Sequence, residues 1–397
     1  MRRPVKIFEE AALGPIRLRN RVIKSATYEN RARDGLVTDA LIAFHAGFAA
    51  GGVGMTTVAY CAVSPEGRTD RHQIVWRPEA LAGLRRLTGA VHAEGAAISA
   101  QIGHSGPVGL SRGGRALALT PSRAAAFATL AARTASVADL TRIVTAHAAA
   151  ARTAIDAGFD AVEIHLGHHY LASAFLSPRL NRRKDAYGGS LENRARFARE
   201  IMRAVRDAAG DRIAILAKLN LDDGVRGGFG LDESVAVARW LEQDGSLDAL
   251  EMTAGSSLLN PMYLFRGGAP VREFAAAMPQ PLRTGLRLAG TRFLREYPYR
   301  DGYLLDDARR VRAAVGLPMV LLGGVTGRTT MDTALAAGFQ FVAMGRALLR
   351  EPDLINRIRA DGTTRSRCDH SNLCMPTIYS DRSHCVLNPS PGTTPGA

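Results

Sequence analysis

The stretch SVADLTRIVTAHAAAARTAIDAGFDAVEIHL, residues 136–166, decides the fold. Its first part, 136–159, spaces apolar residues at helical intervals behind a serine, which predicts a long helix. Its last part, 160–166, is a short apolar run bounded by Asp160, which predicts a strand. A helix followed at once by such a strand is the repeating unit of a parallel sheet with helical crossovers.

The same alternation runs along the whole chain. Short apolar, β-branched runs predict strands at 19–26, 53–60, 96–104, 160–166, 212–220, 247–255, 317–324 and 339–345. Helical spacing predicts helices at 39–52, 78–95, 136–159, 190–210, 231–245, 304–316, 328–338 and 347–362. This alternation predicts an α/β protein, and at 397 residues a closed TIM (β/α)8 barrel fits better than an open sheet. The glycine fingerprint of an open dinucleotide fold is absent from the first strand–helix turn.

Two long loops leave the carboxyl ends of the third and sixth strands, at 109–136 and 256–303. Barrels place their active sites on this face, and long loops there usually cover or shape a site. The second loop is rich in aromatic residues, which suits a planar or apolar ligand. Those residues are Tyr263, Phe265, Phe293, Tyr297, Tyr299 and Tyr303. The alternative is a packed excursion with a small core of its own.

The composition excludes several classes of protein. Hydrophobic residues make up 46% and charged residues 22%, and no apolar run reaches the roughly 18 residues of a transmembrane helix. The segment MRRPVKIFEEAALGPIRLRN lacks the apolar core of a secretory signal, so we expect a cytoplasmic protein with no membrane partner. The net charge of +14 would suit nucleic acid, but the basic residues are scattered and form no such motif. We therefore expect a small-molecule substrate and no nucleic-acid partner.

Glycines and one arginine follow the last two strands. Gly323 and Gly324 end the seventh strand, and Gly345 and Arg346 follow the eighth. In barrels the loops after these strands often bind phosphate, because glycine lets backbone N–H groups approach the phosphate oxygens. Tight turns of ordinary αβ units are the alternative.

Two polar side chains end other strands. Gln101 ends the third strand, and its amide can both donate to and accept from the edge of a heteroaromatic ring. Lys218 ends the fifth strand, where a compact positive charge suits an anionic ring position. Alternatively, Lys218 forms a salt bridge with a nearby carboxylate such as Asp222 or Asp223.

Several motifs together indicate a family. FLSPRLNRRKDAYGGSLENRARFAREI (175–201) follows the patterns F-L-S-P, N-x-R-x-D-x-Y-G-G-S and N-R-x-R-F, and VEIHLGHHYL (162–171) precedes it. GGVGMTTVAYCAVSPEGR (51–68) and GFQFVAMGRALLREPDL (338–354) match as well. On these motifs the chain resembles the Old Yellow Enzyme family of FMN-dependent NAD(P)H:flavin oxidoreductases. The resemblance covers the chain from about residue 7 to 389 and implies a TIM barrel with FMN at the carboxyl ends of its strands.

The resemblance also implies roles for individual residues. Gln101 and Lys218 correspond to contacts with the pyrimidine edge of the flavin, although the family usually has arginine at the second position. The implied cofactor contacts are Ser25, Ala26, Thr27, Gln101, Lys218, Gly323, Gly324, Gly345 and Arg346. His165 and His168 correspond to the pair that hydrogen-bonds the substrate oxygen, and Tyr170 to the proton donor.

The implied reaction is hydride transfer from NAD(P)H through FMN to an activated C=C bond of an enone, enal or dienoyl compound. Two imidazole groups would stabilise the developing enolate, and Tyr170 would protonate the α-carbon. A flavin-dependent dehydrogenase or demethylase of an aromatic or amine substrate is one alternative. A non-catalytic flavoprotein is another. The physiological substrate, the choice of NADH or NADPH and the oligomeric state stay open; a homo-oligomer is compatible with the family.

The chain departs from the family at two positions near the site. Tyr28 stands where we align the Thr or Cys near the flavin C4 carbonyl, and we expect it to contact substrate. His169 stands where glycine is common, and its role stays open. The three histidines could instead ligate a metal, but they lack a fitting carboxylate or cysteine set, so we expect none.

The tail RCDHSNLCMPTIYSDRSHCVLNP (367–389) resembles the cysteine motif that holds an iron–sulfur cluster in the dienoyl-CoA reductase and trimethylamine dehydrogenase group. Cys368, Cys374 and Cys385 remain, but Ser371 replaces a fourth cysteine. Because such a cluster normally needs four thiolates, we expect a remnant without a cluster. The expected organisation is an FMN-binding barrel over 1–365 and a tail over 366–397.

Overall fold

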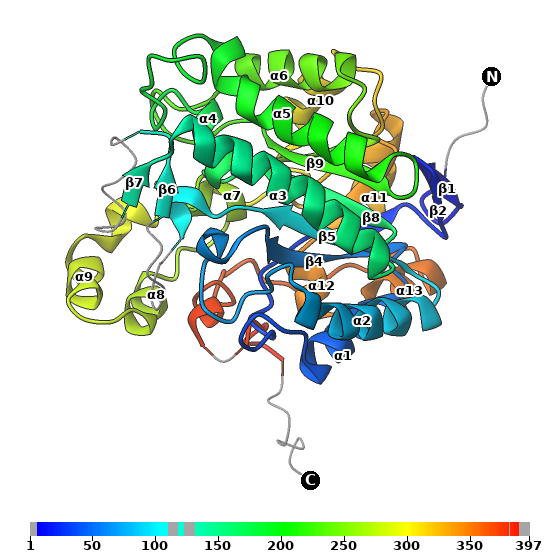
Figure 1. Ribbon diagram of the computed structural model, residues 1–397. Helices are drawn as coiled ribbons and strands as arrows, with labels where there is room; N and C mark the ends of the chain where they lie inside the picture. Colours follow the sequence, from blue (N-terminus) through cyan, green and yellow to red (C-terminus); the bar gives the residue numbers. More distant parts are fainter. Residues whose placement is uncertain (1–5, 110–117, 123–131, 381, 389–397) are drawn as a thin grey trace.

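A closed barrel of eight parallel strands forms the centre of the molecule (Figure 1). The computed structural model describes residues 6–109, 118–122, 132–380 and 382–388. The barrel strands are β3 (Val22–Lys24), β4 (Met55–Ala62), β5 (Ala97–Gly103), β8 (Ala161–Leu166), β9 (Ala214–Asn220), β10 (Ala249–Thr253), β11 (Met319–Leu321) and β12 (Phe341–Met344). They pair in this order, and β12 pairs with β3 to close the ring. The predicted TIM barrel and all eight of its strands are confirmed.

Helices cover the outside of the barrel (Figure 1). Seven predicted helices are present: α1 (Asp39–Ala50), α2 (Leu81–Ala93), α3 (Val137–Asp156), α5 (Leu191–Ala209), α6 (Leu231–Gln243), α10 (Leu305–Arg312) and α11 (Arg328–Ala336). Side chains of Thr38, Ser136 and Ser190 cap α1, α3 and α5 by accepting from backbone N–H groups.

The prediction of one last helix over 347–362 is wrong. The structure has two, α12 (Arg346–Arg350) and α13 (Leu354–Ala360). Pro352 lies between them, and proline interrupts a helix because it has no N–H to donate and its ring clashes with the preceding turn.

The sequence reading also missed an N-terminal hairpin of β1 (Ala11–Leu13) and β2 (Ile16–Leu18), which pair antiparallel. Leu13 and Leu18 are buried in one apolar cluster with Phe341 and with residues at the starts of other barrel strands. The hairpin therefore closes the end of the barrel opposite the carboxyl ends of the strands.

The loop after β10 is a folded excursion. It contains α7 (Pro261–Phe265), α8 (Val271–Ala277) and α9 (Leu282–Phe293), and its buried core includes Phe274, Met278 and Leu286. Met375 of the tail joins this core. The alternative of an excursion with its own small core is therefore confirmed, although part of it also covers the site described below.

The loop after β5 contributes the short parallel pair β6 (Ala118–Thr120) and β7 (Ala132–Thr134). Its positions 110–117 and 123–131 lie outside the described residues. A further short helix, α4 (Leu171–Leu176), follows β8 directly and was not predicted.

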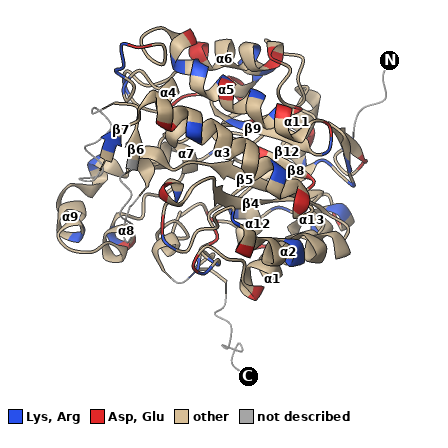
Figure 2. Ribbon diagram, viewed as in Figure 1, with Lys and Arg blue, Asp and Glu red and all other residues tan. Residues whose placement is uncertain are grey.

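Acidic and basic residues are interspersed over the elements (Figure 2). In the part of the chain that the structure describes, we find no helix long and apolar enough to cross a membrane.

Candidate active site

A buried ionic cluster joins neighbouring barrel strands. Lys218 of β9 places its Nζ 3.0 Å from Oε1 of Glu163 on β8 and 2.9 Å from Oε1 of Glu251 on β10. The amide of Gln101 on β5 donates to Glu163 at 2.6 Å, and the hydroxyl of Ser25 donates to Glu251 at 2.8 Å. The expected alternative of a salt bridge at Lys218 is thus present, but with two glutamates that the sequence reading did not name.

The cluster holds one basic side chain, Lys218, between two acidic ones, Glu163 and Glu251. Lys218, Glu163 and Glu251 are all at most 2% exposed, so one ammonium faces two carboxylates away from water. Burial raises the pKa of Glu163 from 4.5 to about 7, against the opposing effect of Lys218. Burial alone would lower the pKa of Lys218, but the two carboxylates outweigh it and raise that pKa. Lys218 therefore stays charged, while Glu163 holds a proton over much of the acidic range.

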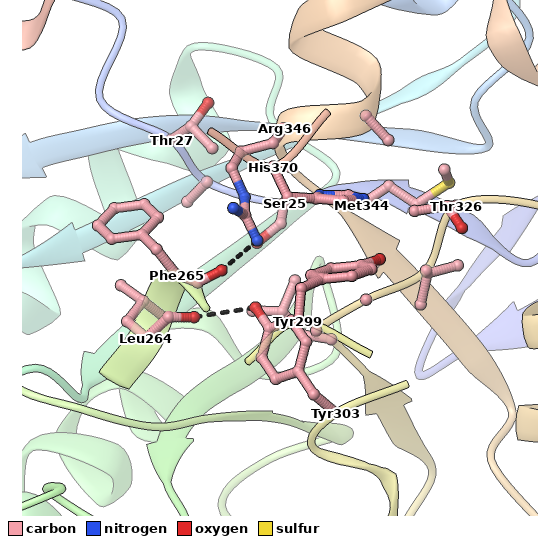
Figure 3. A pocket seen from close by; sticks show the side chains of 18 of the residues that line it. Ser25, Thr27, Leu264, Phe265, Tyr299, Tyr303, Thr326, Met344, Arg346 and His370 are labelled. Carbon is pink, nitrogen blue, oxygen red and sulfur yellow. Dashed lines mark hydrogen bonds between the residues drawn. The ribbon is translucent and has the colours of Figure 1, made fainter. Parts of the chain in front are cut away.

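A pocket of about 690 Å³ opens beside the cluster (Figure 3). Eight of the nine predicted cofactor contacts line it: Ser25, Ala26, Thr27, Lys218, Gly323, Gly324, Gly345 and Arg346. The ninth, Gln101, is not among the lining residues and is linked to the wall through Glu163 and Lys218.

Three of the predicted aromatic residues cover the pocket. Phe265, Tyr299 and Tyr303 line it together with Leu264, whose carbonyl oxygen accepts from the Tyr303 hydroxyl at 2.9 Å (Figure 3). His370 of the tail also lines it and stacks on Tyr299 with ring centroids 3.4 Å apart. The sequence reading did not single out His370, because its place follows from how the tail packs.

Arg346 and two glycines shape one end of the pocket. The guanidinium of Arg346 donates to the carbonyl oxygens of Phe265 and Arg266 and to the side chain of Asn372. Gly323 and Gly324 have φ of +98° and +73°, a region that favours glycine. A Cβ on Gly324 would lie 2.5 Å from the backbone nitrogen of Gly302. This end presents backbone groups at close range beside a fixed positive charge, which suits an anion such as phosphate.

Three aromatic side chains lie in the last part of β8 and in the turn after it. The ring centroid of His165 lies 5.0 Å from that of His168 and 4.4 Å from that of Tyr170, and Tyr60 lies 5.2 Å beyond Tyr170. His168 lines the pocket, and its Nε2 is hydrogen-bonded to Oγ1 of Thr253 at 2.8 Å. Among the described residues, the buried Nδ1 of His165 has no hydrogen-bond partner.

The environment keeps these groups uncharged. Burial, with Lys218 nearby, lowers the pKa of His168 to about 3. Burial and the neighbouring His168 lower the pKa of His165 well below its usual value. Burial raises the pKa of Tyr170 far above its usual range. Near neutral pH the site thus combines two neutral imidazoles with a phenol that keeps its proton.

Comparison with known proteins identifies the family of the chain. Residues 6–253 match the NADH:flavin oxidoreductase / NADH oxidase family. The chain belongs to this family. It is 50% identical to 4,4'-dithiodibutanoate disulfide reductase of Rhodococcus erythropolis over 382 residues, 96% of this chain and 94% of that protein.

Solved structures share the fold. A 2-naphthoyl-CoA reductase superposes with a TM-score of 0.80 at 24% identity, over 96% of this chain and 57% of the other. An old yellow enzyme homologue of Zymomonas mobilis superposes with a TM-score of 0.71 at 21% identity, over 92% and 96%. The resemblance to the Old Yellow Enzyme family is confirmed, and the chain is an FMN-dependent oxidoreductase that uses NAD(P)H.

The pocket of this flavoenzyme fits FMN. Its anion-binding end and its aromatic cover suit a phosphate-bearing heteroaromatic group. We conclude that the residues present are suited to hold the cofactor.

Tyr28 does not line the FMN pocket; its hydroxyl donates to the carboxylate of Asp70. Thr27, one residue earlier, lines the pocket and accepts a hydrogen bond from Nζ of Lys24 at 2.8 Å. Lys24 is fully buried, and burial lowers its pKa to about 8. A lysine in a strand of an arginine-rich chain was the available signal for this contact, which the sequence reading missed.

The three tail cysteines come together beside Arg346. Cys368, Cys374 and Cys385 line one small pocket with Ser371 and Arg346. Burial raises the pKa of Cys368, and that of Cys374 to about 11, so both are thiols near neutral pH. Within the described ranges, no group of three or more His, Cys, Asp or Glu side chains could hold a metal ion.

Proposed function

We propose that this enzyme reduces an activated C=C bond of an enone, enal or dienoyl compound with NAD(P)H as electron donor. The observation that carries the proposal is the contact of His165, His168 and Tyr170 at the end of β8, with both imidazoles neutral and the phenol protonated. Overall, NAD(P)H and one proton convert the alkene to the saturated compound and NAD(P)+.

The two histidines bind the substrate oxygen in this proposal. Neutral imidazole N–H groups of His165 and His168 donate to the carbonyl oxygen and stabilise the negative charge that develops there. Tyr170 holds a proton at its hydroxyl and delivers it to the α-carbon. Bound FMN supplies a carrier that accepts hydride from NAD(P)H and passes it to the substrate.

The cofactor contacts are proposed from the pocket wall. Gly323, Gly324, Gly345 and Arg346 would hold the phosphate, since they form the end of the pocket suited to an anion. Ser25, Ala26 and Thr27 would lie along the ring, and Lys218 would contact its pyrimidine edge. Gln101 would act on that edge by direct contact or through Glu163.

Disulfide reduction is a second candidate, favoured by the 50% identical disulfide reductase. In that reaction the S–S bond breaks, both sulfur atoms leave as thiols, and NAD(P)H and one proton are consumed with release of NAD(P)+. A thiolate needs no protonation at carbon, so Tyr170 would be dispensable.

One experiment separates the candidates. Purified enzyme is reduced with NAD(P)H and then mixed with 2-cyclohexenone or 4,4'-dithiodibutanoate, and reoxidation of the flavin is followed by absorbance. We expect reoxidation by the enone, and Tyr170→Phe should slow this step at least tenfold while leaving reduction by NAD(P)H within about twofold.

The other outcomes decide against the proposal. Reoxidation by the disulfide alone would favour the second candidate. Reoxidation by oxygen alone would favour a dehydrogenase, a demethylase or a non-catalytic flavoprotein. Equal effects of Tyr170→Phe on both half-reactions would reject Tyr170 as proton donor.

A further inference from the structure

His169 follows His168 of the candidate active site, and its ring is fully buried. Its Nδ1 is 2.6 Å from the hydroxyl of Ser256, which follows β10, and its Nε2 is 2.8 Å from Oδ2 of Asp223, which follows β9. Its backbone N–H donates to the hydroxyl of Ser173 on α4 at 3.2 Å. One side chain at the end of β8 is thus joined to the ends of the next two strands.

The hydrogen bonds fix the tautomer of this ring. The Ser256 oxygen accepts from the N–H groups of Leu258 at 3.2 Å and Leu259 at 2.9 Å, so its own hydrogen is left to donate to Nδ1 of His169. Nε2 then carries the hydrogen and donates to Asp223. Asp223 also accepts from the N–H of Phe229 at 2.8 Å. The proton positions are consistent throughout the network.

The network closes on His168. Asn220 donates to Oδ1 of Asp223 at 2.8 Å, and its own Oδ1 accepts the backbone N–H of His168 at 3.2 Å. The carbonyl oxygen of His168 accepts from the N–H of Ser257 at 3.1 Å. Both backbone polar groups of His168 are therefore held by neighbours of the His169 partners, since Asn220 is hydrogen-bonded to Asp223 and Ser257 follows Ser256 in the chain.

The backbone at this point is in an uncommon conformation. His168 and His169 have φ of +60° and +63°, two consecutive left-handed residues that are not glycine. Such conformations persist where the surroundings over-determine them, and they gather at functional sites. Tyr170 follows at once and donates its backbone N–H to Gly167 at 3.1 Å. The turn thus sets the places of His168 and Tyr170 together.

We infer that His169 is a positioning residue: its ring, held by Ser256 and Asp223, locks the turn that presents His168 and Tyr170 to the substrate. The inference rests on the proposed function for the role of those two side chains. The same three residues do not form a nucleophilic Ser–His–Asp site, because all of them are fully buried. Ser256 also accepts two backbone hydrogen bonds already.

The test uses His169→Gly in the FMN-loaded enzyme, because glycine tolerates a φ of +63° and the variant removes the ring without adding backbone strain. We expect its Kd for 4-hydroxybenzaldehyde, measured by calorimetry, to rise at least tenfold, since this phenol probes the oxygen-binding histidines. We also expect the ring signals of His168 in enzyme labelled with 15N-histidine, identified by their loss in His168→Asn, to shift or broaden. His169→Gln, which keeps a donor for Asp223, should recover part of both effects.

His147→Ala is the matched control. His147 is also a buried histidine with a hydrogen bond, from its Nδ1 to the carbonyl oxygen of Ile143 at 2.8 Å, but it lies on α3 outside the barrel. It should leave phenol binding and the His168 signals unchanged. Values for His169→Gly within twofold of the wild type, with unmoved His168 signals, would overturn the inference.

Failure of the proposed function gives a different result. If the wild type neither binds the phenol nor reduces an enone, yet the His168 signals move in His169→Gly, the proposed function is wrong and the positioning role stands. Where His169→Gly does not accumulate as folded protein, Ser256→Ala removes the hydroxyl that holds Nδ1. It is judged by the same two measurements.

Discussion

Removing the charge of Lys218 should destabilise the barrel strongly. In Lys218→Met, Glu163 and Glu251 lose the ammonium that lies 3.0 and 2.9 Å from them. At an effective dielectric constant of about 20, each contact of about 3 Å has a Coulomb energy of ~5 kcal/mol before desolvation is subtracted. Removing one partner of a buried ion pair costs roughly 3–5 kcal/mol, because the remaining charge stays buried. We expect a loss of this size in the free energy of unfolding at pH 8.

The loss should shrink in acid. Burial raises the pKa of Glu163 from 4.5 to about 7, so the folded state binds this proton more tightly than the unfolded chain does. The stability from that proton is complete below pH 4.5 and is lost as the pH rises towards about 7. Without Lys218, which opposes the effect of burial, the pKa of Glu163 rises further, so the variant should lie closer to the wild type at pH 5 than at pH 8.

Urea unfolding at pH 5 and pH 8, followed by circular dichroism, measures both effects. Glu163→Gln in the Lys218→Met background removes one of the two stranded carboxylates and should restore at least half of the loss at pH 8. Lys184→Met, at an exposed lysine, is the matched control and should change stability by less than about 0.5 kcal/mol. A loss below 1 kcal/mol in Lys218→Met, or one that the second substitution leaves unchanged, would refute the reasoning.

Two further predictions concern the pocket wall. Gly324→Ala, which places a Cβ 2.5 Å from a backbone nitrogen at a φ of +73°, should raise the Kd of the apoprotein for FMN about 10- to 100-fold in a fluorescence titration. Gly89→Ala, where a Cβ meets nothing within 4 Å, should leave this Kd unchanged. Equal Kd values for the two variants would contradict the proposed phosphate contact at Gly324. Because burial lowers the pKa of Lys24 from 10.5 to about 8, the wild type should gain stability as the pH rises from 8 to 10.5. Urea unfolding should show that Lys24→Met lacks this gain, and an identical gain in the variant would exclude Lys24 as its source.

Local patterns predicted the barrel because each strand and helix carries its own signal. The apolar run at 160–166 and the capped helix before it need no knowledge of distant residues, and both are present. Pro352 was likewise a local signal for the break between α12 and α13, and the error lay in extending the helical spacing through it. The hairpin at Leu13 and Leu18 gave no comparable signal, since strands of three residues are too short to show a period.

Contacts between side chains on different strands could not be predicted in this way. Gln101 and Lys218 were singled out because they end strands, but their partners Glu163 and Glu251 lie inside strands that read as apolar runs. A buried carboxylate in such a run is itself a signal, because an ionised side chain is buried only where a partner compensates for lost water. Which partner it meets depends on the barrel register, which the sequence pattern does not contain.

The pKa values in the site determine which residues can make its activity depend on pH. A histidine pair at a substrate oxygen invites the assumption that the histidines titrate near neutral pH. Here burial lowers the pKa of His168 to about 3 and that of His165 well below its usual value, so both imidazoles stay neutral donors near neutral pH. Glu163 instead has a pKa of about 7, and through Lys218 it adjoins the pocket wall. Its ionisation adds a negative charge beside Lys218, the proposed contact to the pyrimidine edge of FMN. We therefore expect a change in activity near neutral pH to come from Glu163 or from Lys24 and not from the histidines.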